Sequence, residues 1–287
     1  MTALWTSLAL FAFAANSILC RLALSHGLID PASFTTVRLV AGAVTLALLT
    51  RLVSKSPTPA DPSWTSAGML FLYAAPFSFA YGTLTTGTGA LLLFGAVQVT
   101  MILGTLRAGD RPHPGQWLGL LVAFSGLVYL VFPGIAAPSP IGAALMLLAG
   151  LAWGVYSLRG RAARNPLAQT ASNFARTVPM VLALSLVALR ALHAEPRGLI
   201  LALLSGALAS GVGYVVWYQA LASLPGIAAS VVQLAVPILA AAGGVLVLGE
   251  RITLRIGLAA LMVLGGVALT LLVPSRAREV GAAVSSR

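Results

Sequence analysis

The sequence predicts an all-α polytopic membrane protein with ten transmembrane helices. Of its 287 residues, 59% are hydrophobic and 8% are charged, whereas a soluble domain has about 45–50% apolar and about 25% charged residues. The hydrophobic residues fall in runs of about 20, the length that crosses the hydrocarbon core of a bilayer. The connectors between these runs are short, so no separate soluble domain is expected and any activity must lie within the bundle.

Ten runs meet the length requirement for a span. The first lacks a basic segment and a small-residue cleavage site, so we expect a retained span and not a cleaved signal peptide. In chain order the predicted spans are 2–24, 32–52, 64–82, 85–106, 115–132, 140–159, 169–189, 197–220, 226–249 and 252–273.

The positive charges predict the orientation. The net charge is +11, and because the arginines fall mainly in connectors, they indicate topology and not a nucleic-acid partner. With the N-terminus inside, ten Lys and Arg residues are cytoplasmic: Arg51, Lys55, Arg107, Arg111, Arg159, Arg161, Arg164, Arg276, Arg278 and Arg287. Five lie on the other side: Arg21, Arg190, Arg197, Arg251 and Arg255. This excess predicts cytoplasmic termini in the cell inner membrane, although the uncharged N-terminus followed by Arg21 favours the opposite orientation of the first helix.

Residues typical of enzymes and metalloproteins are scarce. Cys20 is the single cysteine, which excludes an internal disulfide and leaves no cysteine cluster for a metal. His26, His113 and His193 lie in connectors, and the sequence has no GxxxxGK[ST] or HExxH motif. We therefore predict no cofactor and no enzymatic activity.

The chain repeats itself at an offset that drifts from 137 to 140 residues. Matching positions are Arg21 and Arg159, Arg38 and Arg176, Gly126 and Gly266, and the endings "GDR" (109–111) and "GER" (249–251). Each half has five spans, an odd number, so the halves must be inverted relative to each other. Inverted repeats are typical of secondary transporters, whose substrate site lies near the midplane. The predicted units are 1–138, 139–274 and a cytoplasmic tail, 275–287.

Two stretches carry a family resemblance. "WYQALASLPGIAASVVQLAVPILAAAGGVLVLGERIT" in the second half and "GALLLFGAVQVTMILGTLRAGDRPHPGQWLGLLVAFSGLVYL" in the first resemble the EamA-type repeat of the drug/metabolite transporter superfamily. The segment "LLFGAVQVTMI" is similar to the branch of YddG-like aromatic amino-acid exporters. The resemblance covers residues 2–273 and implies two inverted five-helix repeats, with helices 1, 3, 4, 6, 8 and 9 around a central cavity.

Polar and aromatic residues within the spans are the candidate substrate ligands. All six acidic residues lie in loops or at span ends: Asp30, Asp61, Asp110, Glu195, Glu250 and Glu279. A buried proton-coupling carboxylate is therefore not expected, which favours a neutral or zwitterionic substrate. Aromatic faces can stack on a planar apolar group and amides can hold its polar end. The candidates are Asn16, Tyr73, Phe77, Tyr81, Gln98, Trp153, Tyr156, Tyr214, Trp217, Tyr218, Gln219 and Gln233, with Pro76 and Pro237 as hinges.

Simpler interpretations apply to several of these residues. Gln233 could serve only as a hydrogen bond between helices, and aromatic residues also fill cores and line membrane interfaces, where we place Trp5, Trp64 and Trp117. Arg38 and Arg176 lie about 9 Å inside their spans. That depth favours snorkelling to the interface over a substrate or gating role.

The leading hypothesis is a secondary transporter that exports small neutral or zwitterionic metabolites by alternating access. Aromatic or large apolar amino acids are the favoured substrates. Two alternatives remain open: an antiporter of sugar phosphates or nucleotide sugars, which needs buried cations, and a membrane scaffold that moves no solute. The fused repeats are compatible with a functional monomer whose partners are the small-molecule substrate and the lipid bilayer.

Overall fold

The computed structural model describes residues 2–53, 63–107, 113–134, 137–160, 165–221 and 232–273. In these ranges the chain is helical and forms no strand. The helices are α1 (Thr2–Ser25), α2 (Pro31–Val53), α3 (Trp64–Tyr81), α4 (Thr86–Arg107), α5 (Pro114–Val131), α6 (Pro140–Gly160), α7 (Pro166–Val187), η1 (Leu189–Ala191), α8 (Pro196–Leu204), η2 (Ser205–Val212), α9 (Gly213–Leu221), α11 (Ala235–Leu248) and α12 (Leu254–Leu272).

The predicted spans correspond to ten helical rods in the described residues. The segments α8, η2 and α9 follow one another without a break and together form one rod. Six rods are long and apolar enough to cross a membrane on those criteria alone: α1, α2, α4, α5, α6 and the rod that begins at Pro196. α11 and α12 are shorter apolar helices. The prediction of an all-α polytopic membrane protein is confirmed.

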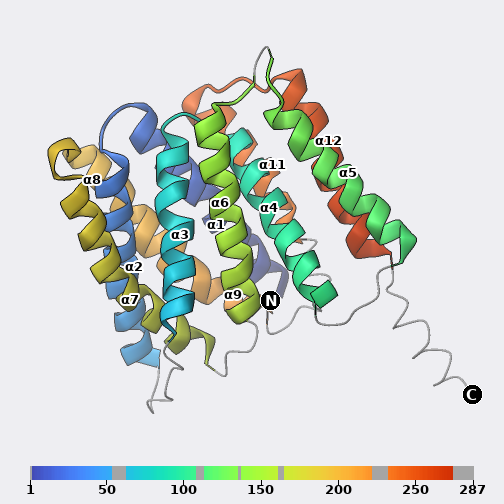
Figure 1. Ribbon diagram of the computed structural model, residues 1–287. Helices are drawn as coiled ribbons and strands as arrows, with labels where there is room; N and C mark the ends of the chain where they lie inside the picture. The colour runs from blue at the N-terminus through green and yellow to red at the C-terminus, as the bar shows by residue number, and fades with distance from the viewer. Residues whose placement is uncertain are drawn as a thin grey trace, which may run out of the picture.

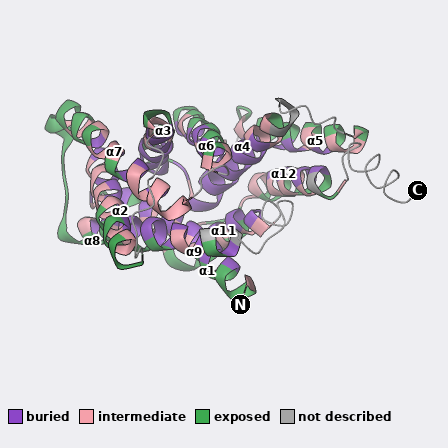
Figure 2. Cartoon of the chain, turned by 90° about the horizontal axis from the view of Figure 1, so that it is seen from below, coloured by how far each residue is buried: buried purple, intermediate pink, exposed green. Residues whose placement is uncertain are grey.

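The rods pack as two layers with a helix pair at each edge. Seen from below, α3, α6 and α4 lie along one side and α9, α11 and α1 along the other (Figure 2). α2 packs on α7 at one edge, and α5 packs on α12 at the other (Figure 1). Buried residues concentrate where the two layers face each other (Figure 2). The midplane of this interface is therefore the place where a site can be enclosed.

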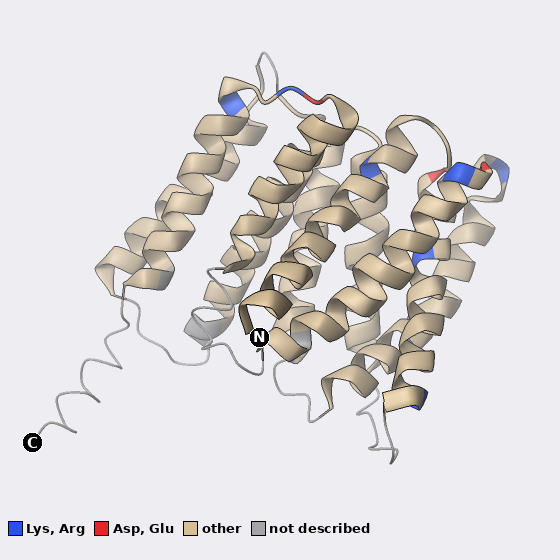
Figure 3. Ribbon diagram, turned by 180° about the vertical axis from the view of Figure 1, so that it is seen from behind, with Lys and Arg blue, Asp and Glu red and all other residues tan. Residues whose placement is uncertain are grey.

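The described acidic residues gather at one end of the bundle. α1 begins and α12 ends at the same face, the lower one in Figure 1. The acidic residues in the described ranges, Asp30, Glu195 and Glu250, all lie at the opposite face, which carries the red segments of Figure 3. α4 ends at the lower face and α11 at the upper face. The repeat-related helix ends therefore lie on opposite sides of the bundle.

One span departs from its predicted form. The run 226–249 was expected to be a single helix, but Leu234 forms a turn and α11 begins at Ala235; residues 222–231 lie outside the described residues. Gly249 ends α11 in the left-handed conformation with φ +67°, which glycine adopts without strain. This turn directs Glu250 back towards α4.

Candidate functional site

A small cavity lies between the two layers of helices. Its lining comes from α1, α3, α4, α6, η2 and α9, and consists of Phe13, Asn16, Ser17, Tyr73, Phe77, Leu93, Phe94, Trp153, Ala209 and Tyr214. The volume is about 20 Å³, close to the space that one water molecule needs. The side chains therefore nearly fill the position where the family resemblance implies a central cavity.

An aromatic cluster forms most of the wall. The Trp153 ring centroid lies 4.7 Å from that of Tyr73, 5.2 Å from that of Tyr214 and 6.5 Å from that of Phe13. Phe13 meets Tyr214 at 6.0 Å with the rings nearly perpendicular. These separations are typical of stabilising aromatic pairs. Each ring comes from a different helix, so movement between the helices would separate the rings and widen the cavity.

A chain of hydrogen bonds forms the polar side of the cavity. The Tyr73 hydroxyl oxygen accepts from Arg38 Nη2 at 2.9 Å and from Asn16 Nδ2 at 3.2 Å. The Ser205 hydroxyl donates to Asn16 Oδ1 at 2.5 Å, and Arg38 Nε donates to Ser210 Oγ at 3.3 Å. All five residues are buried, where unpaired polar groups are costly. The network thus fixes the orientation of Asn16 and Tyr73 beside the cavity.

The π-helical winding of η2 makes this network possible. Ser205 and Ser210 are five residues apart, which in an α-helix would place them about 140° apart around the axis. A π-helix bonds residue i to residue i+5 and brings them to one side, and such segments are frequent at functional sites. Gly206 lets η2 approach α2, since a Cβ there would lie 2.2 Å from the Arg38 carbonyl oxygen. The winding and the glycine together bring both serines to the polar network.

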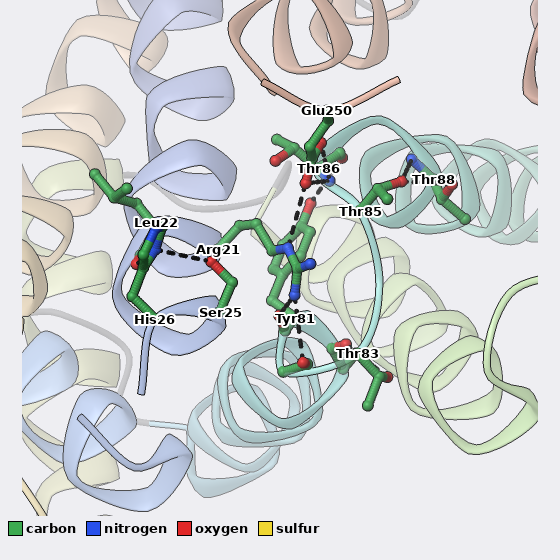
Figure 4. Close-up of polar contacts among 12 residues, drawn as sticks. Arg21, Leu22, Ser25, His26, Tyr81, Thr83, Thr85, Thr86, Thr88 and Glu250 are labelled. Carbon is green, nitrogen blue, oxygen red and sulfur yellow. Dashed lines mark hydrogen bonds and ion pairs between the residues drawn. The ribbon is translucent and has the colours of Figure 1, made fainter. Parts of the chain in front are cut away.

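One end of the bundle is closed by an ion pair. Arg21 Nε lies 3.2 Å from Glu250 Oε1, and Arg21 Nη1 donates to the carbonyl oxygens of Tyr81 at 2.9 Å and Gly82 at 3.3 Å. Both Glu250 oxygens accept from the Thr86 backbone N–H at the start of α4, where the helix dipole favours a carboxylate. Figure 4 shows these contacts converging beside the Tyr81 ring. They join α1, α3, α4 and the end of α11.

Asp30 joins two loops at the same face. Its carboxylate accepts from the backbone N–H groups of Ala32, Ser33 and His193. Partial burial raises the pKa of Asp30, but the hydrogen bonds from Ser33, His193 and Ala32 outweigh that effect and lower the pKa below its ordinary value. The ionised carboxylate therefore stabilises the start of α2 and its link to the loop before α8.

Five of the predicted substrate ligands line the cavity: Asn16, Tyr73, Phe77, Trp153 and Tyr214. Three others contact a ring of the lining. The distances between ring centroids are 4.8 Å for Tyr81 and Phe77, 5.4 Å for Tyr156 and Trp153, and 5.7 Å for Trp217 and Phe13. Gln98 and Gln233 are buried but are not among the lining residues. Aromatic candidates from the predicted spans 64–82 and 197–220 thus meet at one place.

Other predicted site residues are not among the lining of this cavity. Gln219 is exposed. Pro237 is the third residue of α11, residues 222–231 before it lie outside the described residues, and its role as a hinge stays a prediction. Pro76 does lie inside α3 and is buried. The side chain of Tyr218 and the tail 275–287 lie outside the described residues.

The snorkelling prediction is wrong for Arg38. Only 1% of this residue is exposed, because Tyr73 and Ser210 draw the guanidinium inwards. Arg176, in contrast, is half-buried, bonds Ser172 on its own helix and lies 5.8 Å over the exposed Trp64 ring, and its snorkelling stays a prediction. The two repeat-related arginines therefore occupy different environments.

The sequence reasoning missed half of the lining. Phe13, Ser17, Leu93, Phe94 and Ala209 were not predicted. Phe13 lies three residues before Asn16 and four before Ser17, spacings that place Phe13 on the same helix face as each of them. The described residues contain no cluster of His, Cys, Asp and Glu that could hold a metal ion.

The chain resembles known proteins in family, in sequence and in structure. Residues 140–272 match the EamA-like transporter family. The uncharacterized protein PA1977 of Pseudomonas aeruginosa is 52% identical over 270 residues, which is 94% of each chain. A solved crystal structure with 19% sequence identity superposes with a TM-score of 0.66. The superposition covers 93% of this chain and 98% of the chain in that structure. At that identity the structural match supports the fold alone.

Proposed function

The chain belongs to the EamA-like transporter family, and on this premise we propose that it exports small metabolites with an aromatic or large apolar group, most simply amino acids. The observation that carries the proposal is the juxtaposition of an aromatic wall with the Asn16 and Tyr73 polar groups in one midplane cavity. Small-molecule sites combine a mainly apolar lining with a few fixed polar groups. An aromatic amino acid has a ring that can pack on the aromatic wall and a polar end that can bond the polar groups.

Alternating access supplies the mechanism. At about 20 Å³ the cavity is too small for an amino acid, so substrate entry requires the rings on α1, α3, α6 and α9 to separate. Pro76 leaves a gap in the hydrogen bonds of α3, and the π-helical η2 is a second point where a rod can change its winding. With the Arg21 end closed by Glu250, substrate would enter and leave by the opposite end in this conformation.

The orientation and energy source form part of the proposal. Basic residues favour a cytoplasmic location for the face at which α1 begins, which places the Arg21 end on the outside of the cell inner membrane. The acidic residues in the described ranges lie at one face, away from the cavity. We therefore propose transport down the gradient of the substrate without proton coupling.

Counterflow in proteoliposomes tests the function. Vesicles preloaded with phenylalanine should accumulate labelled phenylalanine or tryptophan without an imposed proton gradient. Trp153→Ala should lower the rate at least about fivefold, since stacking on an aromatic ring contributes on the order of 1 kcal/mol or more. Trp117→Ala is the matched control, because this ring is exposed at the start of α5. Absence of counterflow in wild type, or equal loss in both variants, would overturn the proposal.

A further inference from the structure

Arg38 is a buried cation with no acidic partner in the described part of the chain. Its guanidinium bonds the neutral hydroxyls of Tyr73 and Ser210 and lies 5.1 Å and 4.9 Å over the rings of Tyr73 and Phe77. Within the described residues Nη1 has no hydrogen-bond partner. A buried unpaired charge is costly and in a membrane span usually has a function.

The described carboxylates are engaged or distant. Glu250 pairs with Arg21 at the closed end, Asp30 caps α2, and Glu195 lies in the loop before α8 beside His193. None of them reaches the middle of the bundle. The positive charge of Arg38 is therefore offset only by hydroxyls and ring faces.

The cavity lies one side chain away from this charge. Tyr73 and Phe77 touch the guanidinium and also line the cavity. The Tyr73 oxygen accepts from two donors, Arg38 and Asn16, while Asn16 Oδ1 is occupied by Ser205. The polar side of the cavity is thus rich in donors, and the group it lacks is a negatively charged acceptor.

We infer that the cavity recognises an organic monoanion, a carboxylate attached to an apolar or aromatic ring, with Arg38 supplying the counter-charge. This inference about binding rests on the proposed function only in taking the bound anion to be the transported substrate. A monoanion neutralises the site, whereas an amine adds a second positive charge. The carboxylate of an amino acid would satisfy the site, and its ammonium group is not required.

Arg176 provides a matched control. It lies at the corresponding position of the second half, 138 residues later, but it is half-buried and bonds Ser172 on its own helix. Neutralising Arg176 removes the same charge from the chain without changing the cavity. A general effect of net charge would appear in both variants, and a site effect only at Arg38.

A ligand series on the purified protein tests the inference without transport. Thermal stabilisation is measured with 3-phenylpropionate, phenylalanine, phenethylamine and phenyl phosphate. We expect 3-phenylpropionate to bind at least as well as phenylalanine and at least about tenfold more tightly than phenethylamine, since one unscreened charge interaction is of this order. Arg38→Gln should abolish the preference for acid over amine, Arg38→Lys should keep it with weaker binding, and Arg176→Gln should leave it unchanged.

The outcomes separate this inference from the proposed function. Equal binding of acid and amine to wild type, or an unchanged preference in Arg38→Gln, would overturn it. A tenfold preference for phenyl phosphate over 3-phenylpropionate would also overturn it, in favour of a phosphate ester. If Arg38→Gln does not fold, the preference for acid over amine is compared between wild type and Arg38→Lys, and its absence in both would overturn the inference. Charge-selective binding without counterflow would uphold the inference and refute transport.

Discussion

Two repeat-related arginines hold the two ends of the bundle in different ways. Arg21 forms an ion pair with Glu250 and bonds two carbonyl oxygens at the end of α3. Within the described residues Arg159, 138 residues later, bonds the hydroxyls of Ser66 at 3.0 Å and Ser63 at 3.1 Å. The counterpart of Glu250 in the repeat is Asp110, which lies outside the described residues. Among the described contacts, therefore, Arg21 meets a carboxylate and Arg159 meets hydroxyls.

This difference bears on how firmly the Arg21 end is closed. Both arginines donate from a charged guanidinium, but among the described contacts Arg21 also meets an ionised acceptor, and the attraction between opposite charges adds to its hydrogen bond. The Glu250 contacts also tie α11 in the second half to α1 and α4 in the first, so opening this end must break them. In an alternating-access cycle such contacts set the balance between the two conformations. The conformation described is one in which the Arg21 end is locked.

Removal of the Glu250 carboxylate is the strongest test of this comparison. Glu250→Ala leaves Arg21 unpaired and removes the acceptor of the Thr86 N–H. Because both side chains are slightly exposed, at 18% and 12%, we expect a destabilisation of the closed end of about 2 kcal/mol, below the 3–5 kcal/mol typical of a fully buried pair. Cys20, the single cysteine, is fully buried one residue before Arg21. Its maleimide labelling in nanodiscs should become about 30-fold faster.

Glu195→Ala is the control for this variant. Glu195 lies at the same face, but its side chain is half exposed and its Oε1 lies 3.8 Å from His193 Nε2. Exposed pairs contribute little, so labelling of Cys20 should match that of wild type. If Glu250→Ala also labels at the wild-type rate, the ion pair does not hold this end closed.

The spans could be predicted because membrane insertion depends on local composition. The ten apolar runs correspond to the helical rods, and helix ends shifted by only a few residues where a cap could be identified in the structure. Asn165, for example, caps α7 through its side chain and starts it earlier than predicted. The turn at Leu234 and the π-helical η2 could not be predicted, since apolar runs contain no signal for helix winding.

Site residues could be predicted from the sequence only where the residue type itself suggested a position in the site. Tyr73 and Phe77 were found because aromatic residues recurred on one helix face, whereas Phe13 resembled its apolar neighbours. Arg38 and Arg176 have the same depth in their spans, and counting residues cannot distinguish them. Their environments differ because Arg38 meets Tyr73 and Ser210, which are 35 and 172 residues away. Such long-range partners follow from tertiary packing and not from local pattern.

The Arg159 end should respond less to the equivalent change. Arg159→Gln removes two hydrogen bonds from a guanidinium to the serines at the start of α3, where Ser63 also caps the helix. We expect a loss of about 1 kcal/mol in stability, measured by thermal unfolding in detergent. Labelling of Cys20 should stay within about twofold of wild type, because its end of the bundle is unaffected. Labelling as fast as in Glu250→Ala would mean that the two ends are not independent.

The smallest expected effect concerns Asp30, a second link at the Arg21 face. Since its folded-state pKa is lowered, ionised Asp30 stabilises the fold above its unfolded-state pKa of about 4, and this contribution is lost as the pH falls through the lower folded-state pKa. Asp30→Asn should cost less than about 1 kcal/mol at pH 7, since the amide oxygen can still cap α2. The difference in melting temperature between wild type and variant should shrink from pH 7 to pH 3. A constant difference would mean that the charge of Asp30 does not stabilise this face.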